Sequence, residues 1–194
     1  MKKVILFVVI SLAISSVAAQ NNGEQAGKHE LSAGVGVFSF NQALSALGDL
    51  LGTAATAGYV TTAGDYNWFT PFISYQYAFS KRFSLGGTFA FDYNTLKVSN
   101  HDTPVGNYKR YYSTFSLEGV LNYMNNGNSR LYGLLGGGVT VTSIPDNKEK
   151  INNLVYPNFQ ISPIGYKFGD KIGGFVELGY GYKGFINAGV FTRF

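Results

Sequence analysis

The sequence predicts an all-β protein, an eight-stranded antiparallel up-and-down β-barrel that crosses a membrane. Three observations lead to this prediction. Charged residues make up only 13% of the chain, about half the share found in soluble domains, while aromatic residues reach 16%. Apolar and polar residues alternate with period two along most of the chain. After the N-terminal region there is no apolar run of about 18 residues, so we expect no transmembrane helix.

The N-terminal region has the layout of a secretory signal peptide. Lys2 and Lys3 form a positive n-region, an apolar run follows, and Val17-Ala18-Ala19 is an acceptable cleavage site. The apolar run is too short for a membrane anchor. We therefore expect export across the inner membrane of a Gram-negative cell. The expected divisions are a signal peptide (1–19), a flexible lead-in (20–29) and one transmembrane barrel domain (30–194).

Turn residues divide the alternating region into eight expected strands. These strands span roughly 30–40, 66–79, 83–95, 109–124, 129–142, 156–168, 173–182 and 185–194. Three short connections alternate with three longer ones at 41–65, 96–108 and 143–155, as in a barrel with short periplasmic turns and long outer loops. The connection at Lys183-Gly184 is unusually short for an outer loop, and we expect Gly184 to adopt a positive φ there.

The two faces of the expected strands differ in chemistry. One face is apolar and almost free of charge, as at Phe83, Leu85 and Phe89. The opposite face consists mostly of Gly, Ser, Thr and Asn, with isolated charges. In a soluble sandwich this second face would meet water and carry many Lys and Glu residues. The pattern instead favours a crowded polar interior and an exterior that contacts lipid.

Four charged side chains occupy mid-strand positions on the polar face: Asp92, Glu118, Glu177 and Arg193. Unpaired charges in a tight interior are costly, so we expect a lumen charge network. Glu177 is the acid nearest to Arg193 along the chain, and Arg110 is a further candidate member. The main interpretation is a structural network that fills the lumen. The alternative is a gated path for ions or small solutes, although eight strands leave little room for a pore.

The longest expected connection, 41–65, is the candidate interaction loop. Asn41 is available as the N-cap of a short helix within it. The leucines at helical spacing are Leu44, Leu47, Leu50 and Leu51. One interpretation is an amphipathic helix that covers the barrel rim or rests at the membrane interface. The other is a partner-binding element, because so long a connection in a compact barrel is uncommon and often functional.

Residues that would indicate catalysis or cofactor binding are sparse. The chain has no Cys, which excludes disulfides and thiolate metal sites. Its two histidines, His29 and His101, are expected on opposite sides of the membrane. Ser99, His101 and Asp102 share one outer loop, but neighbours in an irregular loop rarely form an oriented nucleophile–base pair. We therefore expect no enzyme, no cofactor and no metal.

Two further sequence patterns are also without function in this interpretation. The pattern Gly179-x-Gly181-x-x-Gly184 matches the dinucleotide fingerprint, but it crosses an expected hairpin instead of joining a strand to a helix. The basic runs of the expected mature chain contain no more than two residues. A nucleic-acid partner is therefore not expected, because its binding needs a concentrated basic patch.

Three segments resemble a known family: residues 159–166, residues 177–184 and the ending Thr192-Arg193-Phe194. They resemble the "outer membrane protein beta-barrel domain" group of small OmpA/OmpX-like barrels, over essentially the whole expected mature chain. The resemblance implies a location in outer-membrane lipid and recognition of the terminal Phe194 by the outer-membrane assembly machinery. Such barrels host many functions. A structural or surface-interaction role (adhesion or binding of an unknown ligand) comes first, a narrow channel second and a lipid-modifying enzyme third.

Overall fold

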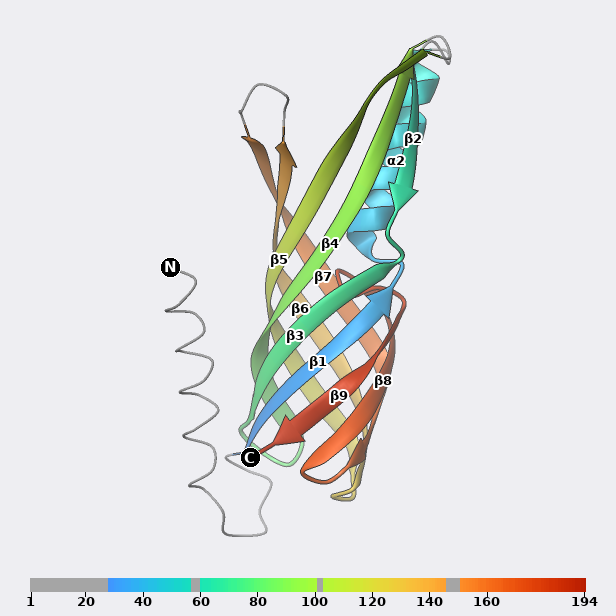
Figure 1. Cartoon of the computed structure of the whole chain (residues 1–194). Helices are drawn as coiled ribbons and strands as arrows, with labels where there is room; N and C mark the ends of the chain where they lie inside the picture. Colours follow the sequence, from blue (N-terminus) through green and yellow to red (C-terminus); the bar gives the residue numbers. More distant parts are fainter. Residues whose placement is uncertain (1–27, 57–59, 101–102, 146–150) are drawn as a thin grey trace.

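The computed structural model describes residues 28–56, 60–100, 103–145 and 151–194. Within these residues, one helix and nine strands are formed, and Figure 1 shows the strands closing into a barrel. The helix is α2 (Phe40–Ala55). The strands are β1 (His29–Val37), β2 (Val60–Tyr66), β3 (Phe69–Ala78), β4 (Phe83–Asn100), β5 (Thr103–Asn125), β6 (Ser129–Pro145), β7 (Ile151–Gly169), β8 (Ile172–Gly181) and β9 (Ile186–Arg193). The expected signal peptide and nearly all of the lead-in lie outside the described residues.

Eight of the described strands form a closed antiparallel ring. The order β4-β3-β1-β9-β8-β7-β6-β5 returns to β4, because β4 pairs with both β3 and β5. The predicted eight-stranded up-and-down barrel is therefore confirmed. The remaining strand, β2, pairs with β4 and extends the sheet beyond the ring. The short connections and the C-terminus lie at one end, called here the lower end, and α2 and β2 lie at the upper end (Figure 1).

Two strand pairs are longer than the sequence predicts. The pairing of β4 with β5 continues to Asn100 and Thr103, within the loop expected at 96–108. The pairing of β6 with β7 continues to Pro145 and Ile151, within the loop expected at 143–155. Both predicted loop boundaries are wrong for the same reason. Backbone hydrogen bonds continue the strands where the apolar alternation of the sequence has ended.

The barrel wall is low on the side of β8 and β9. These strands have 10 and 8 residues, whereas β5 has 23. The pairing of β7 with β8 ends at Gln160 and Gly181, so β7 continues upward without β8 beside it. The hairpin between β8 and β9 closes through Gly184, whose φ of 117° confirms the predicted positive φ. Helix α2 rises from this low side and packs mainly along β2 (Figure 1).

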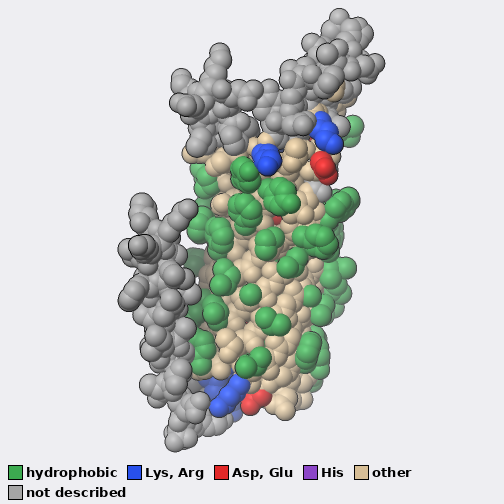
Figure 2. All heavy atoms as spheres, in the orientation of Figure 1, with side chains coloured by type: hydrophobic (Ala, Val, Ile, Leu, Met, Phe, Trp, Pro, Cys, Tyr) green, Lys and Arg blue, Asp and Glu red, His purple; other side chains and the backbone are tan. Residues whose placement is uncertain are grey.

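The barrel is apolar outside and polar inside. Leu117 and Ile172 are exposed by 69% and 77%, whereas Glu118 is completely buried. Figure 2 shows hydrophobic side chains over the middle of the wall and charged side chains towards its two ends. An apolar surface this extensive is stable only against lipid, so the chain is a transmembrane β-barrel. In the described residues, no helix is both long and apolar enough to span a membrane.

Candidate functional site

Helix α2 begins at the upper rim with a complete capping box. The Ser39 hydroxyl accepts a hydrogen bond from the Gln42 backbone N–H at 3.4 Å. The Gln42 side-chain oxygen accepts one from the Ser39 backbone N–H at 3.2 Å. The predicted N-cap, Asn41, is therefore wrong. Ser39 supplies the acceptor for a free backbone N–H group at the start of the helix. The Asn41 side chain is therefore not needed as a cap, and it is buried inside the barrel.

The buried polar face of α2 meets an upper layer of polar side chains inside the barrel. The Asp92 carboxylate accepts hydrogen bonds from Ser39 at 3.0 Å, from Asn41 at 2.7 Å and from Thr70. The Asn41 side-chain oxygen Oδ1 accepts a further bond from Asn158 Nδ2 at 2.7 Å. None of the ion pairs among the described residues involves Asp92. Asp92, predicted as a member of a charge network, instead fastens the helix to the barrel through neutral partners.

A second contact holds the next turn of α2. Ser45 Oγ lies 2.5 Å from the Tyr112 hydroxyl of β5. Arg110, the further candidate for the charge network, donates to the same Tyr112 hydroxyl at 3.4 Å. Among the described residues Arg110 forms no ion pair with Asp92, so it belongs to the rim of the barrel.

The polar face of α2 is inside, so its apolar face points outward. The buried residues of the helix are Asn41, Gln42, Ser45 and Asp49. The four leucines of the candidate interaction loop, called here the leucine face, are 43–65% exposed: Leu44, Leu47, Leu50 and Leu51. An amphipathic helix of a soluble protein has the opposite arrangement. Phe40, the first residue of α2, lies on the apolar side of the helix with the leucines. Its ring contacts the outward-facing rings of Phe159 and Tyr180 at centroid distances of 5.4 and 6.0 Å.

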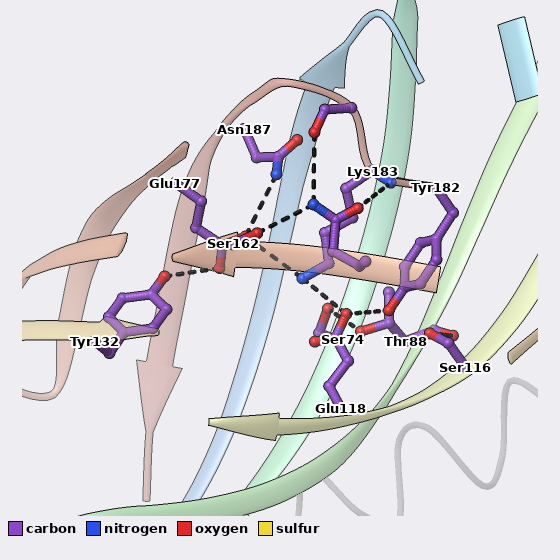
Figure 3. Close-up of polar contacts among 12 residues, drawn as sticks. Ser74, Thr88, Ser116, Glu118, Tyr132, Ser162, Glu177, Tyr182, Lys183 and Asn187 are labelled. Atoms are coloured by element: carbon purple, nitrogen blue, oxygen red, sulfur yellow. Dashed lines mark hydrogen bonds and ion pairs between the residues drawn. The ribbon is translucent and has the colours of Figure 1, made fainter. Parts of the chain in front are cut away.

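A middle layer of charged side chains lies below α2 (Figure 3). Lys183 Nζ is 2.8 Å from Glu118 Oε1 and 3.6 Å from Glu177 Oε2. The Tyr182 hydroxyl donates to Glu118 at 2.5 Å, and the Tyr132 hydroxyl donates to Glu177 at 2.7 Å. All five side chains are almost completely buried. One cation and two tyrosines therefore bind two carboxylates in the centre of the barrel, while Glu118 Oε2 is buried with no hydrogen-bond partner among the described residues.

Lys183, which the sequence places in an outer connection, enters the lumen in the structure. The connection folds inward and its backbone lies directly against Gly36 of β1. A Cβ atom on Gly36 would be 1.7 Å from the Lys183 carbonyl oxygen. The sequence feature that could have indicated this inward fold is the pair of glycines around the connection, Gly181 and Gly184. Both have positive φ in the structure. They allow a reversal tight enough for Lys183 to enter the barrel.

A lower layer lies near the short turns and contains Glu30 with three cations. Glu30 Oε2 is 2.6 Å from Arg130 Nη2 and 3.5 Å from Arg193 Nη2, and Glu30 Oε1 accepts from Lys167 Nζ. Arg193 therefore pairs with Glu30 and not with Glu177, the acid nearest to it along the chain. Arg193 lies directly beside Glu30 across the pairing of β1 with β9. Glu177 lies beside Asn187, which is six positions or about 20 Å farther along β9.

The four predicted lumen charges therefore do not form one network. Asp92, Glu118, Glu177 and Arg193 are all buried inside the barrel, but they belong to the upper, middle and lower layers. The sequence analysis missed the partners that complete these layers: Glu30, Arg130, Lys167 and Lys183. All four lie near strand ends or in a connection, where sequence periodicity carries little information.

The remaining candidates lie at the ends of the barrel. Phe194 follows β9 and exchanges two backbone hydrogen bonds with His29, of 2.8 and 2.9 Å. The proposed assembly signal at Phe194 stays a prediction.

His29 Nδ1 lies 2.5 Å from the Tyr75 hydroxyl. His101 and Asp102 lie outside the described residues, and within the described ranges no group of three or more His, Cys, Asp or Glu side chains could hold a metal ion.

Comparison with known proteins finds no matching family model and no matching curated protein. Among solved structures, the chain is similar to Ail, the attachment invasion locus protein of Yersinia pestis, at 15% identity, 87% coverage of this chain and 99% of Ail. The TM-scores are 0.44 for Ail and 0.46 for its complex with the heparin analogue sucrose octasulfate. The outer membrane protein OprG from Pseudomonas aeruginosa is 11% identical, with 89% and 98% coverage and a TM-score of 0.47. No shared function is inferred from identities this low.

Proposed function

We propose that this chain is a Gram-negative outer-membrane surface protein, in which a closed barrel anchors α2 and presents its leucine face to a partner. The supporting observation is the inverted orientation of the helix. Hydrogen bonds from Ser39, Asn41 and Ser45 fasten its polar face to the barrel. Rotating the leucines inward would break these bonds, so the fold keeps the apolar face available for contact.

The orientation in the membrane follows from the lengths of the connections. Short turns characterise the periplasmic end of outer-membrane barrels, and longer hairpins characterise the outer end. On this basis α2, β2 and the long hairpins project from the cell surface (Figure 1). The leucine face then lies at or above the outer lipid leaflet, where a surface partner could reach it.

The available apolar area limits the strength of the contact. Complete burial of a leucine side chain contributes about 1.5–3 kcal/mol. When a partner covers a leucine that is already half-buried, about half of this free energy can be gained. The leucine face could then contribute roughly 3–6 kcal/mol to binding. This corresponds to a weak single contact, which becomes effective when many copies on a cell bind together.

The packing of the interior does not support the narrow-channel alternative. Tyr132, Tyr182 and Lys183 fill the middle of the barrel, and their polar atoms are bound to Glu118 and Glu177. An ion crossing this layer would have to displace buried, paired charges. The lipid-modifying alternative depends on His101 and Asp102, which lie outside the described residues.

The test compares two quadruple variants of the leucine face displayed on Gram-negative cells. One variant changes Leu44, Leu47, Leu50 and Leu51 to Gln, which retains helix propensity but removes the apolar face. The other changes the same four residues to Met, which keeps the face apolar. We expect both to insert and to retain heat-modifiable gel mobility. Only the Gln variant should reduce cell aggregation and adhesion to protein-coated surfaces. Equal adhesion by native, Gln and Met forms would contradict the proposal.

A further inference from the structure

The lower layer contains more positive charge than it can neutralise. The guanidinium groups of Arg130 and Arg193 both approach Glu30 Oε2, at 2.6 and 3.5 Å, and the Lys167 ammonium contacts Glu30 Oε1. Guanidinium groups remain charged in proteins. One carboxylate therefore serves three cations, and both of its oxygens are already occupied.

The other acids inside the barrel are engaged in other layers. Glu118 and Glu177 pair with Lys183 in the middle layer. Asp92 accepts hydrogen bonds at the foot of α2 in the upper layer. Asp170 lies in the turn between β7 and β8, where it is exposed to solvent. Among the described residues, Glu30 is therefore the one carboxylate that forms close ion pairs with the cations of the lower layer.

Aromatic rings close the lower layer on one side. Arg130 and Arg193 lie over the ring of Phe191, with distances of 5.2 and 5.6 Å from the guanidinium carbon to the ring centroid. Lys167 Nζ lies 4.8 Å from the centroid of the Tyr132 ring. Cations bind favourably to ring faces, but a ring accepts no conventional hydrogen bond. The rings therefore use none of the N–H donors of these cations.

A pocket opens at this same end of the barrel. It is open to solvent and encloses about 20 Å³, and Arg130 and Arg193 form part of its wall together with polar side chains from several strands. Lys28, at the start of the described chain, also lines it. Arg130 is 8% exposed, and its Nε–H is buried with no hydrogen-bond partner among the described residues. This N–H donor is therefore available to an acceptor that the chain itself does not supply.

We propose that this pocket binds an oxyanion, a carboxylate or phosphate group that enters from the periplasmic end of the barrel. Its oxygens accept hydrogen bonds from Arg130 Nε–H and from the Arg193 guanidinium. Planar guanidinium groups bind both kinds of oxyanion through paired, charge-assisted hydrogen bonds. Glu30 holds the three cations of the lower layer together, and the bound anion neutralises their remaining charge. This site is independent of the leucine face and lies at the opposite end of the molecule.

The experiment follows the arginine side chains of the refolded full-length mature protein by NMR in detergent micelles. The chain has only four arginines, so each Nε–H resonance can be assigned with Arg→Lys variants: Arg82, Arg110, Arg130 and Arg193. Acetate and then inorganic phosphate replace chloride at constant ionic strength. We expect saturable shifts at Arg130 and Arg193 and none at the exposed Arg82, which reports nonspecific electrostatic effects. Shifts that grow linearly at all four arginines, or no shifts at all, would overturn the proposal.

A matched pair of variants tests whether the pocket itself is required. Arg130→Gln should weaken the saturable shift at Arg193 about tenfold or more, because it removes a charge-assisted donor. Lys171→Gln removes an exposed cation from the neighbouring turn and should leave the affinity unchanged. An equal loss in both variants would indicate general surface charge and contradict a built site. If Arg130→Gln does not refold, Arg193→Gln is measured through the Arg130 resonance instead.

Two membrane compositions distinguish the source of the anion. The same spectra are recorded in nanodiscs of zwitterionic phosphatidylcholine and in nanodiscs containing anionic phosphatidylglycerol, without added acetate or phosphate. Shifts at Arg130 and Arg193 in the anionic nanodiscs alone would identify a lipid headgroup as the ligand. Shifts that require added acetate or phosphate would identify a soluble anion. If neither condition moves these two resonances, the anion site is wrong.

Discussion

The middle and upper layers lie in the same barrel, yet they are stabilised by different interactions. In the middle layer, Glu118 and Glu177 share the Lys183 ammonium. In the upper layer, Asp92 has three neutral donors, two of which belong to the segment that begins α2. The first arrangement joins strands of the wall to one another. The second attaches a helix to the wall, so disrupting it should release the helix and leave the barrel closed.

The largest effect is expected from Lys183→Met. The change leaves Glu118 and Glu177 buried without a cation, and removal of one partner from a buried ion pair costs about 3–5 kcal/mol. We expect a clear decrease in the urea midpoint of unfolding in micelles. Adding Glu118→Gln should restore part of the loss. Lys97→Met removes an exposed lysine and serves as the control. A Lys183 variant as stable as this control would mean that the middle layer is not a structural ion pair.

A smaller loss is expected from Gly36→Ala, which tests the inward fold of the Lys183 connection without changing any charge. The added Cβ would lie 1.7 Å from the Lys183 carbonyl oxygen, so this backbone must move. Overpacking of this kind typically costs about 1–3 kcal/mol. Gly137→Ala is the matched control, because a Cβ there meets no atom within 4 Å. Equal unfolding midpoints for the two variants would argue against the inward connection.

Asp92→Asn should affect the upper layer more than the barrel. Replacing a charged acceptor by a neutral one weakens hydrogen bonds that contribute about 1.5–3 kcal/mol each. Trp68, the only tryptophan, stacks on Phe38 beside the start of α2 at 5.6 Å and reports on this region. We expect faster trypsin cleavage of the upper hairpins and altered Trp68 emission, with retained heat-modifiable mobility. Asp65→Asn, on the exposed part of β2, should change none of these.

The smallest effect is expected in a double-mutant cycle between Arg193 and Glu177. The two residues belong to different layers, so the change Arg193→Met together with Glu177→Gln should show coupling near zero. The cycle between Arg193 and Glu30 should show measurable coupling, because their charged atoms are 3.5 Å apart. Unfolding midpoints of the single and double variants provide both values. Stronger coupling to Glu177 than to Glu30 would reverse the assignment of the lower layer.

The sequence predicted the fold well because its signals are local. Strand faces alternate from one residue to the next, and lipid on the outside with packed polar groups inside gives each face a distinct chemistry. The prediction failed where that contrast ends. Above the membrane, β4, β5, β6 and β7 continue through hydrogen bonding between strands, which leaves little trace in composition.

Helix α2 illustrates the same limit within one element. The spacing of the leucines predicted the helix, but not its orientation or its N-cap. The orientation depends on Asp92, Thr114 and Asn158, which come from three strands and meet only when the barrel has closed. The sequence analysis placed Asn41 at the cap because asparagine is a good capping residue. In the folded barrel, the same side chain has better partners in the lumen.

The sequence by itself determined the barrel, the number of strands in its wall, the apolar exterior and the presence of buried charges. Only the tertiary structure decided which charges meet. Along the sequence, Glu30 is 100 residues away from Arg130 and 163 away from Arg193. Lys183 lies in the connection between β8 and β9 and reaches Glu118 of β5. Strand tilt and closure of the ring set the height of each inward side chain, and these depend on all eight strands at once. Periodicity gives the face of a residue, but the height that selects its partner is a property of the closed barrel.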